Sequence, residues 1–240
     1  MIDAAEALST NYAAVQREIR AAAERAGRDP ADIRLVAVTK TVSPERVREA
    51  FRIGLKAFGE NRVQEAVPKI DALKDLDCEW HMVGHLQTNK VRFVEGRFST
   101  LHSLDSERLV ETLDRRLTQS LDVLIEVNVA GERQKTGAGL RDAAVVVRAA
   151  RQSAHLKLRG LMTIAPEGDP AAARTAFREL RALRDRLQDE QSVSLPELSM
   201  GMSDDFQFAV EEGATMLRLG RALFGPRPAA RREAAGAGFR

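Results

Sequence analysis

The chain has 240 residues, of which 44% are hydrophobic and 30% are charged, and its formal net charge of +2 is close to balance. These proportions exclude a largely disordered chain, and the single cysteine, Cys78, excludes an internal disulfide and a multi-cysteine metal site and suits a reducing compartment. The sequence has no signal-peptide segment and no run of roughly 18 apolar residues, so we expect a cytoplasmic protein that binds no membrane. Its arginines are scattered along the chain and form no basic patch, so we expect no nucleic-acid binding. We also expect no bound metal.

Residues 1–30 carry charges at helical spacing and predict a helical extension ahead of the main domain. From residue 31 onward, segments rich in β-forming residues alternate with segments of helical periodicity. The expected strands span residues 33–40, 56–59, 79–86, 98–105, 121–129, 156–164, 196–202 and 215–220. The expected helices span residues 43–54, 61–73, 88–96, 105–120, 140–154, 170–190 and 203–213. Residues 227–240 are expected to form a flexible tail.

Eight strands that alternate with seven helices are typical of parallel βαβ units. The simplest closed arrangement of such units is a single α/β domain, a (β/α)8 TIM-type barrel. We expect this barrel to span residues 31–226, because no linker rich in proline, glycine or serine divides the chain. A doubly wound open sheet is the alternative.

The first predicted strand ends in a lysine, Lys40. Because side chains alternate along a strand, Val36, Val38 and Lys40 share one face. If that face points into the core, the amine of Lys40 lies above it. Such a position is costly for a charged ammonium unless it is paired, solvated or chemically occupied.

Functional groups of a barrel collect where strands end. The polar residues at predicted strand ends are Lys40, Asn61, His85, Asn128, Ser203, Arg218 and Arg221. His81 lies earlier, within the body of a strand. Taken singly, a histidine such as His81 or His85 more often lines a barrel or contacts a loop than carries chemistry.

A glycine turn follows each of the last two predicted strands. Gly201 and Ser203 precede a short helix, and Gly220 follows the final strand. Such turns often bind phosphate, because glycine lets backbone amides approach an anion and a helix N-terminus adds partial positive charge. The two aspartates after Ser203 favour the opposite reading, since they could occupy the helix end themselves. Arg218 would add a permanently cationic donor beside this site.

A strand-end lysine across from a phosphate site suits two kinds of chemistry. The first is a phosphate-bearing aldehyde cofactor, and pyridoxal 5'-phosphate matches because its aldehyde forms a Schiff base with a lysine. The second is a lysine-type aldolase that acts on a sugar phosphate.

Eight segments together resemble the pyridoxal phosphate homeostasis proteins, which are single-domain relatives of the alanine racemase barrel. In chain order they are LVAVTKT, GENRVQE, WHMVGHLQTNK, HSLD, LIEVNVAGERQKTG, RGLMTI, LSMGMSDDFQFAV and LRLGRALFG. They run from about residue 35 to residue 225 and leave out the N-terminal helix and the tail. The resemblance implies an alanine-racemase-like barrel that holds pyridoxal phosphate as a lysine aldimine.

By that resemblance, Lys40 is the Schiff-base lysine and Arg218 faces the pyridine nitrogen. The other implied cofactor-binding residues are Ser203, Gly220 and Arg221 for the phosphate, Ser199 as a second candidate for the phosphate, and Asn61 and His81 for the cofactor face. Gly220 and Arg221 would act through their backbone amides.

The resemblance implies a protein that holds pyridoxal phosphate and supplies it to apo-enzymes, and not an enzyme. An arginine against the pyridine nitrogen disfavours ring protonation, so the ring is a weaker electron sink. An amino-acid racemase of low activity is the alternative, although racemisation usually needs a base on each face of the substrate. The sole tyrosine, Tyr12, lies in the predicted first helix. No length remains for a second domain and its dimer surface, so we expect a monomer.

Overall fold

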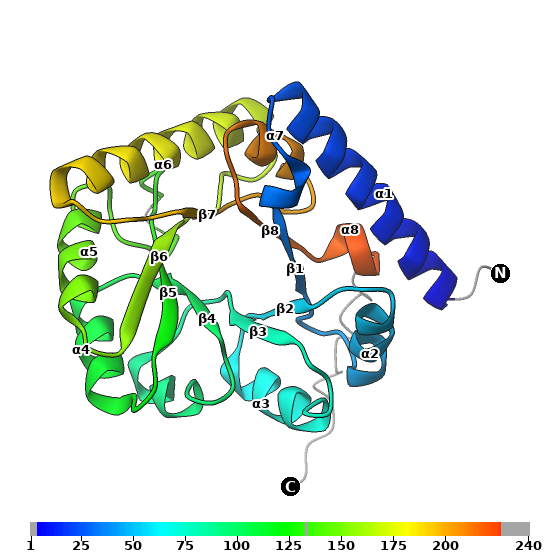
Figure 1. Ribbon diagram of the computed structural model, residues 1–240, viewed down its shortest axis with the longest axis horizontal. Coiled ribbons are helices and arrows are strands. Elements are labelled where there is room, and N and C mark those ends of the chain that lie inside the picture. The colour runs from blue at the N-terminus through cyan, green and yellow to red at the C-terminus, as the bar shows by residue number, and fades with distance from the viewer. Residues whose placement is uncertain (1–3, 133, 227–240) are drawn as a thin grey trace, which may run out of the picture.

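The computed structural model describes residues 4–132 and 134–226. Eight parallel strands close into a barrel in chain order, and β1 pairs with both β2 and β8 (Figure 1). The predicted TIM-type (β/α)8 barrel is therefore confirmed, and the alternative of an open doubly wound sheet is wrong. The predicted tail, residues 227–240, lies outside the described residues.

The strands are short, and most end earlier than the sequence predicts. Their bounds are β1 (Arg34–Val38), β2 (Ala57–Glu60), β3 (Glu79–Met82), β4 (Thr100–Leu104), β5 (Leu121–Glu126), β6 (Leu156–Met162), β7 (Glu197–Ser199) and β8 (Met216–Leu219). β-forming residues such as Val83 and Val129 continue into the loops beyond the strands, which explains the longer predicted runs.

The α-helices are α1 (Ala4–Arg25), α2 (Pro44–Arg52), α3 (Val63–Ala72), α4 (Glu107–Arg116), α5 (Ala143–Gln152), α6 (Pro170–Gln191), α7 (Phe206–Glu211) and α8 (Arg221–Phe224), and the 3₁₀-helices are η1 (Pro30–Asp32) and η2 (Thr88–Phe93). The prediction of a helix over residues 88–96 is wrong in type, because η2 is a 3₁₀-helix. Its N-cap residue Gln87 makes no capping bond, and β-branched Val91 and Val94 lower α-helix propensity. The short helix α8 is an addition to the predicted set.

The face of β1 that carries Val36 and Val38 points into the barrel. Both residues belong to a small apolar cluster with Ala57 and Val83, whereas Ala37 packs outward in the main core. The even-numbered residues of β1 thus point into the barrel and the odd-numbered residues point outward, as strand alternation predicts. Lys40, which is also even-numbered, follows on the inward face.

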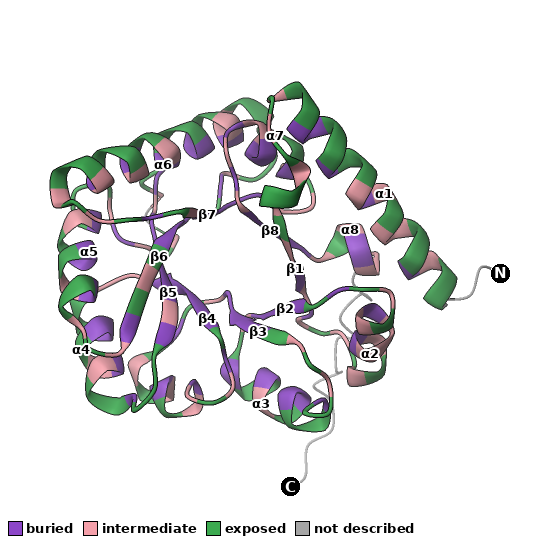
Figure 2. Ribbon diagram, in the orientation of Figure 1, coloured by how far each residue is buried: buried purple, intermediate pink, exposed green. Residues whose placement is uncertain are grey.

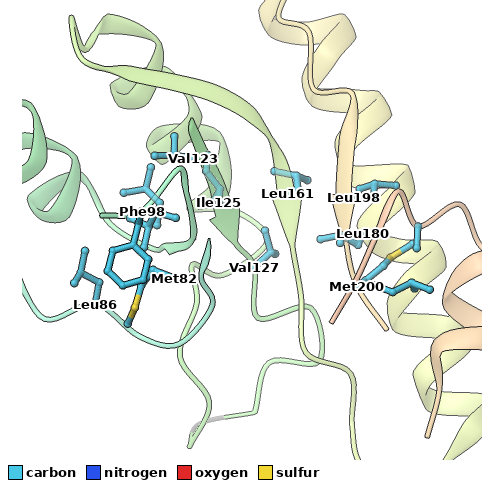
Figure 3. Packing of buried hydrophobic residues seen from close by; sticks show 14 of the residues in the cluster. Met82, Leu86, Phe98, Val123, Ile125, Val127, Leu161, Leu180, Leu198 and Met200 are labelled. Atoms are coloured by element: carbon cyan, nitrogen blue, oxygen red, sulfur yellow. The ribbon is translucent and has the colours of Figure 1, made fainter. Parts of the chain in front are cut away.

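The main core lies between the outer surface of the barrel and the surrounding helices. Buried residues follow the strands and the inner helix faces, and exposed residues follow the outer helix faces (Figure 2). Ile125 of β5, Leu161 of β6 and Leu198 of β7 pack in this layer together with Leu180 of α6 (Figure 3). This layer fixes the strand ends that carry the polar residues.

Helix α1 lies across the outside of the barrel beside α7 and α8 (Figure 1). Asn11 Nδ2 donates to the carbonyl of Leu223 at 3.0 Å, and Arg25 pairs with Glu211 at 2.8 Å. The N-terminal helix is therefore fastened next to the turn that follows β8. Among the described residues, no helix combines the length and the apolar character needed to cross a membrane.

Candidate functional site

A cavity of about 650 Å³ opens at the carboxyl end of the barrel strands. This is the size of a small-molecule site. It brings together six of the eight sequence-predicted site residues, which are Lys40, Asn61, Ser203, Arg218, Gly220 and Arg221. The other two, His81 and Ser199, are fully buried and do not line it.

Lys40 lines the cavity two residues beyond the end of β1. The preceding residue, Thr39, is fully buried, and its amide donates to the Gly59 carbonyl at 2.9 Å. The following residue, Thr41, has a φ of 66°, a left-handed conformation that is strained for a β-branched side chain. The chain therefore continues along β2 as far as Thr39 and turns directly after Lys40, which lies at the cavity wall.

A buried ion pair supports this strand end from behind. Glu60 Oε1 accepts from Lys69 Nζ at 2.6 Å and from the Thr39 hydroxyl at 2.6 Å, and Lys69 Nζ also donates to the Thr39 carbonyl at 2.7 Å. Breaking a buried ion pair is costly because it leaves an unpaired charge in the protein interior. These bonds therefore stabilise the backbone conformation just before Lys40. They also commit the amine of Lys69 to a structural role.

Asn61 reaches the cavity because the loops after β2 and β3 touch. A Cβ atom at Gly84 would lie 2.4 Å from the Asn61 carbonyl oxygen. The glycine is therefore required for this close approach. Asn61, Gly84 and His85 also line a neighbouring cavity of about 540 Å³ with Lys90.

Arg218 of β8 forms the cationic floor of the cavity. One terminal nitrogen donates to the Ser199 hydroxyl at 2.6 Å, and the other donates to the Thr163 carbonyl at 2.8 Å. Burial lowers the pKa of Arg218 to about 10, so the side chain remains cationic near neutral pH. Glu126 and Asp205 oppose that shift through their negative charge.

The glycine turns after β7 and β8 converge at one corner of the cavity. The Ser203 hydroxyl accepts from the Ala222 amide at 3.1 Å, which joins the first turn to the start of α8. Gly201 has a φ of 93°, and a Cβ there would lie 2.6 Å from the Ala209 Cβ, so this position requires glycine. Backbone amides and a serine hydroxyl thus meet where an anion is expected.

Neither of the two aspartates after Ser203 lines the cavity. Asp204 pairs with the side chain of Arg221, and Asp205 accepts from the Met202 amide within its own loop. Burial raises the pKa of Asp205. The aspartates therefore hold the turn together and leave its serine at the cavity surface.

The selection of site residues left out Glu126 and His85, among other residues that line the cavity. Glu126 ends β5, is 4% exposed and accepts from the Thr136 hydroxyl at 2.6 Å, and burial raises its pKa. His85 is half exposed and lies 3.3 Å from Asp105. The alternation that singles out Lys40 would also have found Glu126, which shares the inward face with buried Leu124.

His81 and Ser199 meet at a third residue, His102. His81 Nδ1 lies 2.9 Å from His102 Nε2, and His102 Nδ1 lies 2.8 Å from the Ser199 hydroxyl. All three side chains are fully buried. Their position favours support of Arg218 over direct contact with a ligand in the cavity.

We expect the free energy of unfolding to fall as the pH drops below about 6.5, in part because of His102. Burial in the first place, and then the neighbouring His81 and the positive charge of Arg218, hold the pKa of His102 well below its ordinary value of 6.5. Below pH 6.5 this histidine binds a proton in the unfolded chain but not in the folded chain. The free energy of unfolding therefore falls by up to about 1.4 kcal/mol for each pH unit. Urea unfolding at several pH values would measure the slope. An unchanged slope in His102→Asn would contradict this source.

The chain matches the family described as "Alanine racemase, N-terminal domain" over residues 10–228. It is 48% identical over 217 residues to the "Pyridoxal phosphate homeostasis protein" of Aquifex aeolicus, covering 89% of this chain and 95% of that protein. The structure of PipY from Synechococcus elongatus with pyridoxal phosphate bound is 36% identical, with a TM-score of 0.80 over 91% of this chain and all of that one. Alanine racemase from Corynebacterium glutamicum shares the fold, with 20% identity, a TM-score of 0.68 and coverage of 96% of this chain and 64% of its own.

Proposed function

Because the chain belongs to the pyridoxal phosphate homeostasis protein family, we propose that it binds pyridoxal 5'-phosphate in the cavity, holds it covalently through Lys40 and supplies it within the cell. The observation that carries the proposal is the meeting of an amine, a buried guanidinium and a glycine-turn anion site around one cavity. These three groups match the aldehyde, the ring nitrogen and the phosphate of the cofactor.

The cofactor, when bound, supplies an aldehyde that condenses with a lysine amine, with loss of water. Among the described residues, Lys40 is the lysine that lines the cavity, and its amine is the one placed for this bond, whereas Lys69 lies outside the cavity in the buried pair with Glu60. Arg218, which lines the cavity, would face the ring nitrogen with its cationic guanidinium. Ser203 and the amides of Gly220 and Arg221 would hold the phosphate.

The choice of arginine at the cavity floor favours storage over catalysis. A cation beside the ring nitrogen opposes protonation of that nitrogen, so the ring withdraws electrons less strongly than one paired with a carboxylate. Reactions that need a long-lived carbanion are discouraged in this way. The cavity therefore suits a reversible covalent reservoir.

The proposal extends to how the protein works in the cell. We expect a monomer that passes the cofactor to apo forms of pyridoxal-phosphate-dependent enzymes. We place it in the cytoplasm, since its single cysteine, Cys78, is a free thiol that suits a reducing compartment. Activity recovery of an apo-enzyme mixed with the cofactor-bearing protein, compared with free cofactor, tests the transfer.

We expect the phosphate to anchor the ligand more strongly than the ring does. Each charge-assisted hydrogen bond contributes about 1.5–3 kcal/mol, so the loss of two such bonds weakens binding about 100-fold or more. Pyridoxal, which lacks the phosphate, should bind that much more weakly in a fluorescence or absorbance titration, and Ser203→Ala should lower the affinity for pyridoxal phosphate. Ser9→Ala, at an exposed site on α1, is the matched control. Equal affinity for the two ligands would contradict the phosphate site.

A further inference from the structure

A continuous row of hydrogen bonds runs through the barrel interior behind Arg218. An Arg218 terminal nitrogen lies 2.6 Å from Ser199 Oγ, and that oxygen lies 2.8 Å from His102 Nδ1. His102 Nε2 lies 2.9 Å from His81 Nδ1, and His81 Nε2 lies 3.4 Å from a carboxylate oxygen of Glu79. The row crosses from β8 through β7 and β4 to β3.

The two ends of the row lie at opposite ends of the barrel. Arg218 lines the cavity, whereas Glu79 begins β3. The Glu79 side chain is 53% exposed and lies 3.6 Å from Arg34 at the start of β1. Between these ends, Ser199, His102 and His81 are 0% exposed, so water does not reach them from solvent.

The chemistry of the two ends favours one direction for the bonds of the row, in which Ser199 and each histidine both accept and donate a hydrogen bond. A guanidinium has N–H donors and no acceptor, so Ser199 accepts from Arg218, and the acceptor next to its one hydroxyl hydrogen is His102 Nδ1 at 2.8 Å. His102 then carries its proton on Nε2 and donates to His81 Nδ1. His81 in turn carries its proton on Nε2 and donates to the Glu79 carboxylate.

This direction requires both histidines to be neutral. A second proton on His102 would place a hydrogen on Nδ1, reverse its bond with Ser199 and leave the Ser199 hydroxyl hydrogen without this acceptor. The surroundings oppose that proton: burial and the positive charge of Arg218 lower the pKa of His102, and Arg34 acts in the same sense. The bond from His81 lowers the pKa of Glu79, which keeps the acceptor at the far end ionised.

We propose that Ser199 and His102 are positioning residues that fix the guanidinium of Arg218 for the ring nitrogen of the cofactor, through a row of one-way hydrogen bonds that ends at Glu79. This inference rests on the proposed function. The bonds to Ser199 and to the Thr163 carbonyl use one N–H on each terminal nitrogen of Arg218 and leave the other N–H groups for the cavity. Without the Ser199 oxygen, the guanidinium loses one of the two acceptors that set its rotation.

The first test uses the protein without cofactor and needs no substitution. Long-range ¹⁵N–¹H NMR of the imidazole nitrogens reports which nitrogen carries the proton. We expect His102 and His81 to be neutral with the proton on Nε2 at pH 7. A proton on Nδ1 of His102, or a doubly protonated ring, would overturn the inference whether or not the protein binds the cofactor.

The second test compares variants once pyridoxal phosphate is bound. Ser199→Ala and His102→Leu should shift the visible absorption band and its pH midpoint, whereas Ser199→Thr and His102→Asn, which retain a hydroxyl and an acceptor, should stay close to wild type. Ser103→Ala is the matched control, because Ser103 is equally buried but donates to the Gly84 carbonyl at 2.7 Å.

The variants separate this inference from the proposed function. A wild-type protein without a cofactor band would contradict the proposed function itself. A normal wild-type band that Ser199→Ala and His102→Leu leave unchanged in position and pH midpoint would overturn the positioning role and leave the proposed function intact.

Discussion

Replacing Lys40 with alanine is expected to abolish covalent attachment of pyridoxal phosphate while the barrel stays folded. Lys40 lines the cavity beyond the end of β1 and is half-buried, so its removal leaves the packed layers intact. The buried supports behind it, Thr39, Glu60 and Lys69, keep their mutual bonds. Wild-type protein treated with the cofactor and then with borohydride should gain the mass of one reduced adduct, and Lys40→Ala should gain none.

Two other lysines serve as controls for this experiment. Lys56 lies with its amine 3.6 Å from the centre of the Phe51 ring, and Lys90 lines the neighbouring cavity. Lys56→Ala and Lys90→Ala should therefore be labelled as fully as wild type. Peptide mapping that located the adduct on Lys56 or Lys90 in wild-type protein would show that the assignment of Lys40 is wrong.

The barrel could be predicted because strand and helix patterns alternate with little ambiguity along residues 31–226. Two details could not, and each has a local cause. The segment Thr88–Phe93 reads as helical by its apolar spacing, but it has no capping side chain and forms a 3₁₀-helix. Helix α8 is four residues long, too short for a periodic pattern to show.

The position of the candidate site followed from the strand ends, and strand alternation gave the inward direction of its side chains, whereas the depth of each side chain in the barrel did not follow from the sequence. Lys40 and Arg218 share faces with Val36 and Met216, and both line the cavity. His81 lies on an inward face too, but deeper in the barrel, below the cavity. A sequence cannot show that depth, since it depends on the stagger of neighbouring strands.

Glu126 shows a second limit of the sequence. Strand alternation places Glu126 on the inward face, but nothing in the sequence motif shows that the Thr136 hydroxyl donates to its carboxylate at 2.6 Å. The contact depends on the loop after β5, which returns to bridge Val127 with Ala138. Long-range loop closure of this kind leaves no periodic signal.

We expect no substantial turnover of amino acids, with a kcat below about 1 s⁻¹, the lower end of ordinary enzymes. A positioned acid or base contributes about 10²- to 10⁴-fold, and racemisation needs one on each face of the substrate. Lys40 could serve one face. The sole tyrosine of the chain, Tyr12, packs against the core from α1 and does not line the cavity.

His85 is the residue that could replace the missing second base. Among the described residues that line the cavity it is the one histidine, it is half exposed, and Asp105 lies 3.3 Å from its Nδ1, an arrangement that orients an imidazole for proton transfer. His81, the other histidine considered from the sequence, is fully buried and turned toward His102. Any slow residual racemisation should therefore depend on His85.

The decisive experiment makes two measurements on wild type, His85→Ala and Lys40→Ala. The first is the rate of racemisation of alanine and serine, and the second is the transfer of cofactor to an apo-enzyme. We expect transfer by wild type and by His85→Ala, loss of transfer from Lys40→Ala, and racemisation that is slow in wild type and lower still in His85→Ala. A wild-type kcat of about 1 s⁻¹ or more, lost in His85→Ala, would show a two-base racemase and overturn storage as the main role. The structure argues against that result, because Tyr12 does not line the cavity, and because Arg218, which stays cationic up to its pKa of about 10, disfavours protonation of the ring and makes it a weaker electron sink.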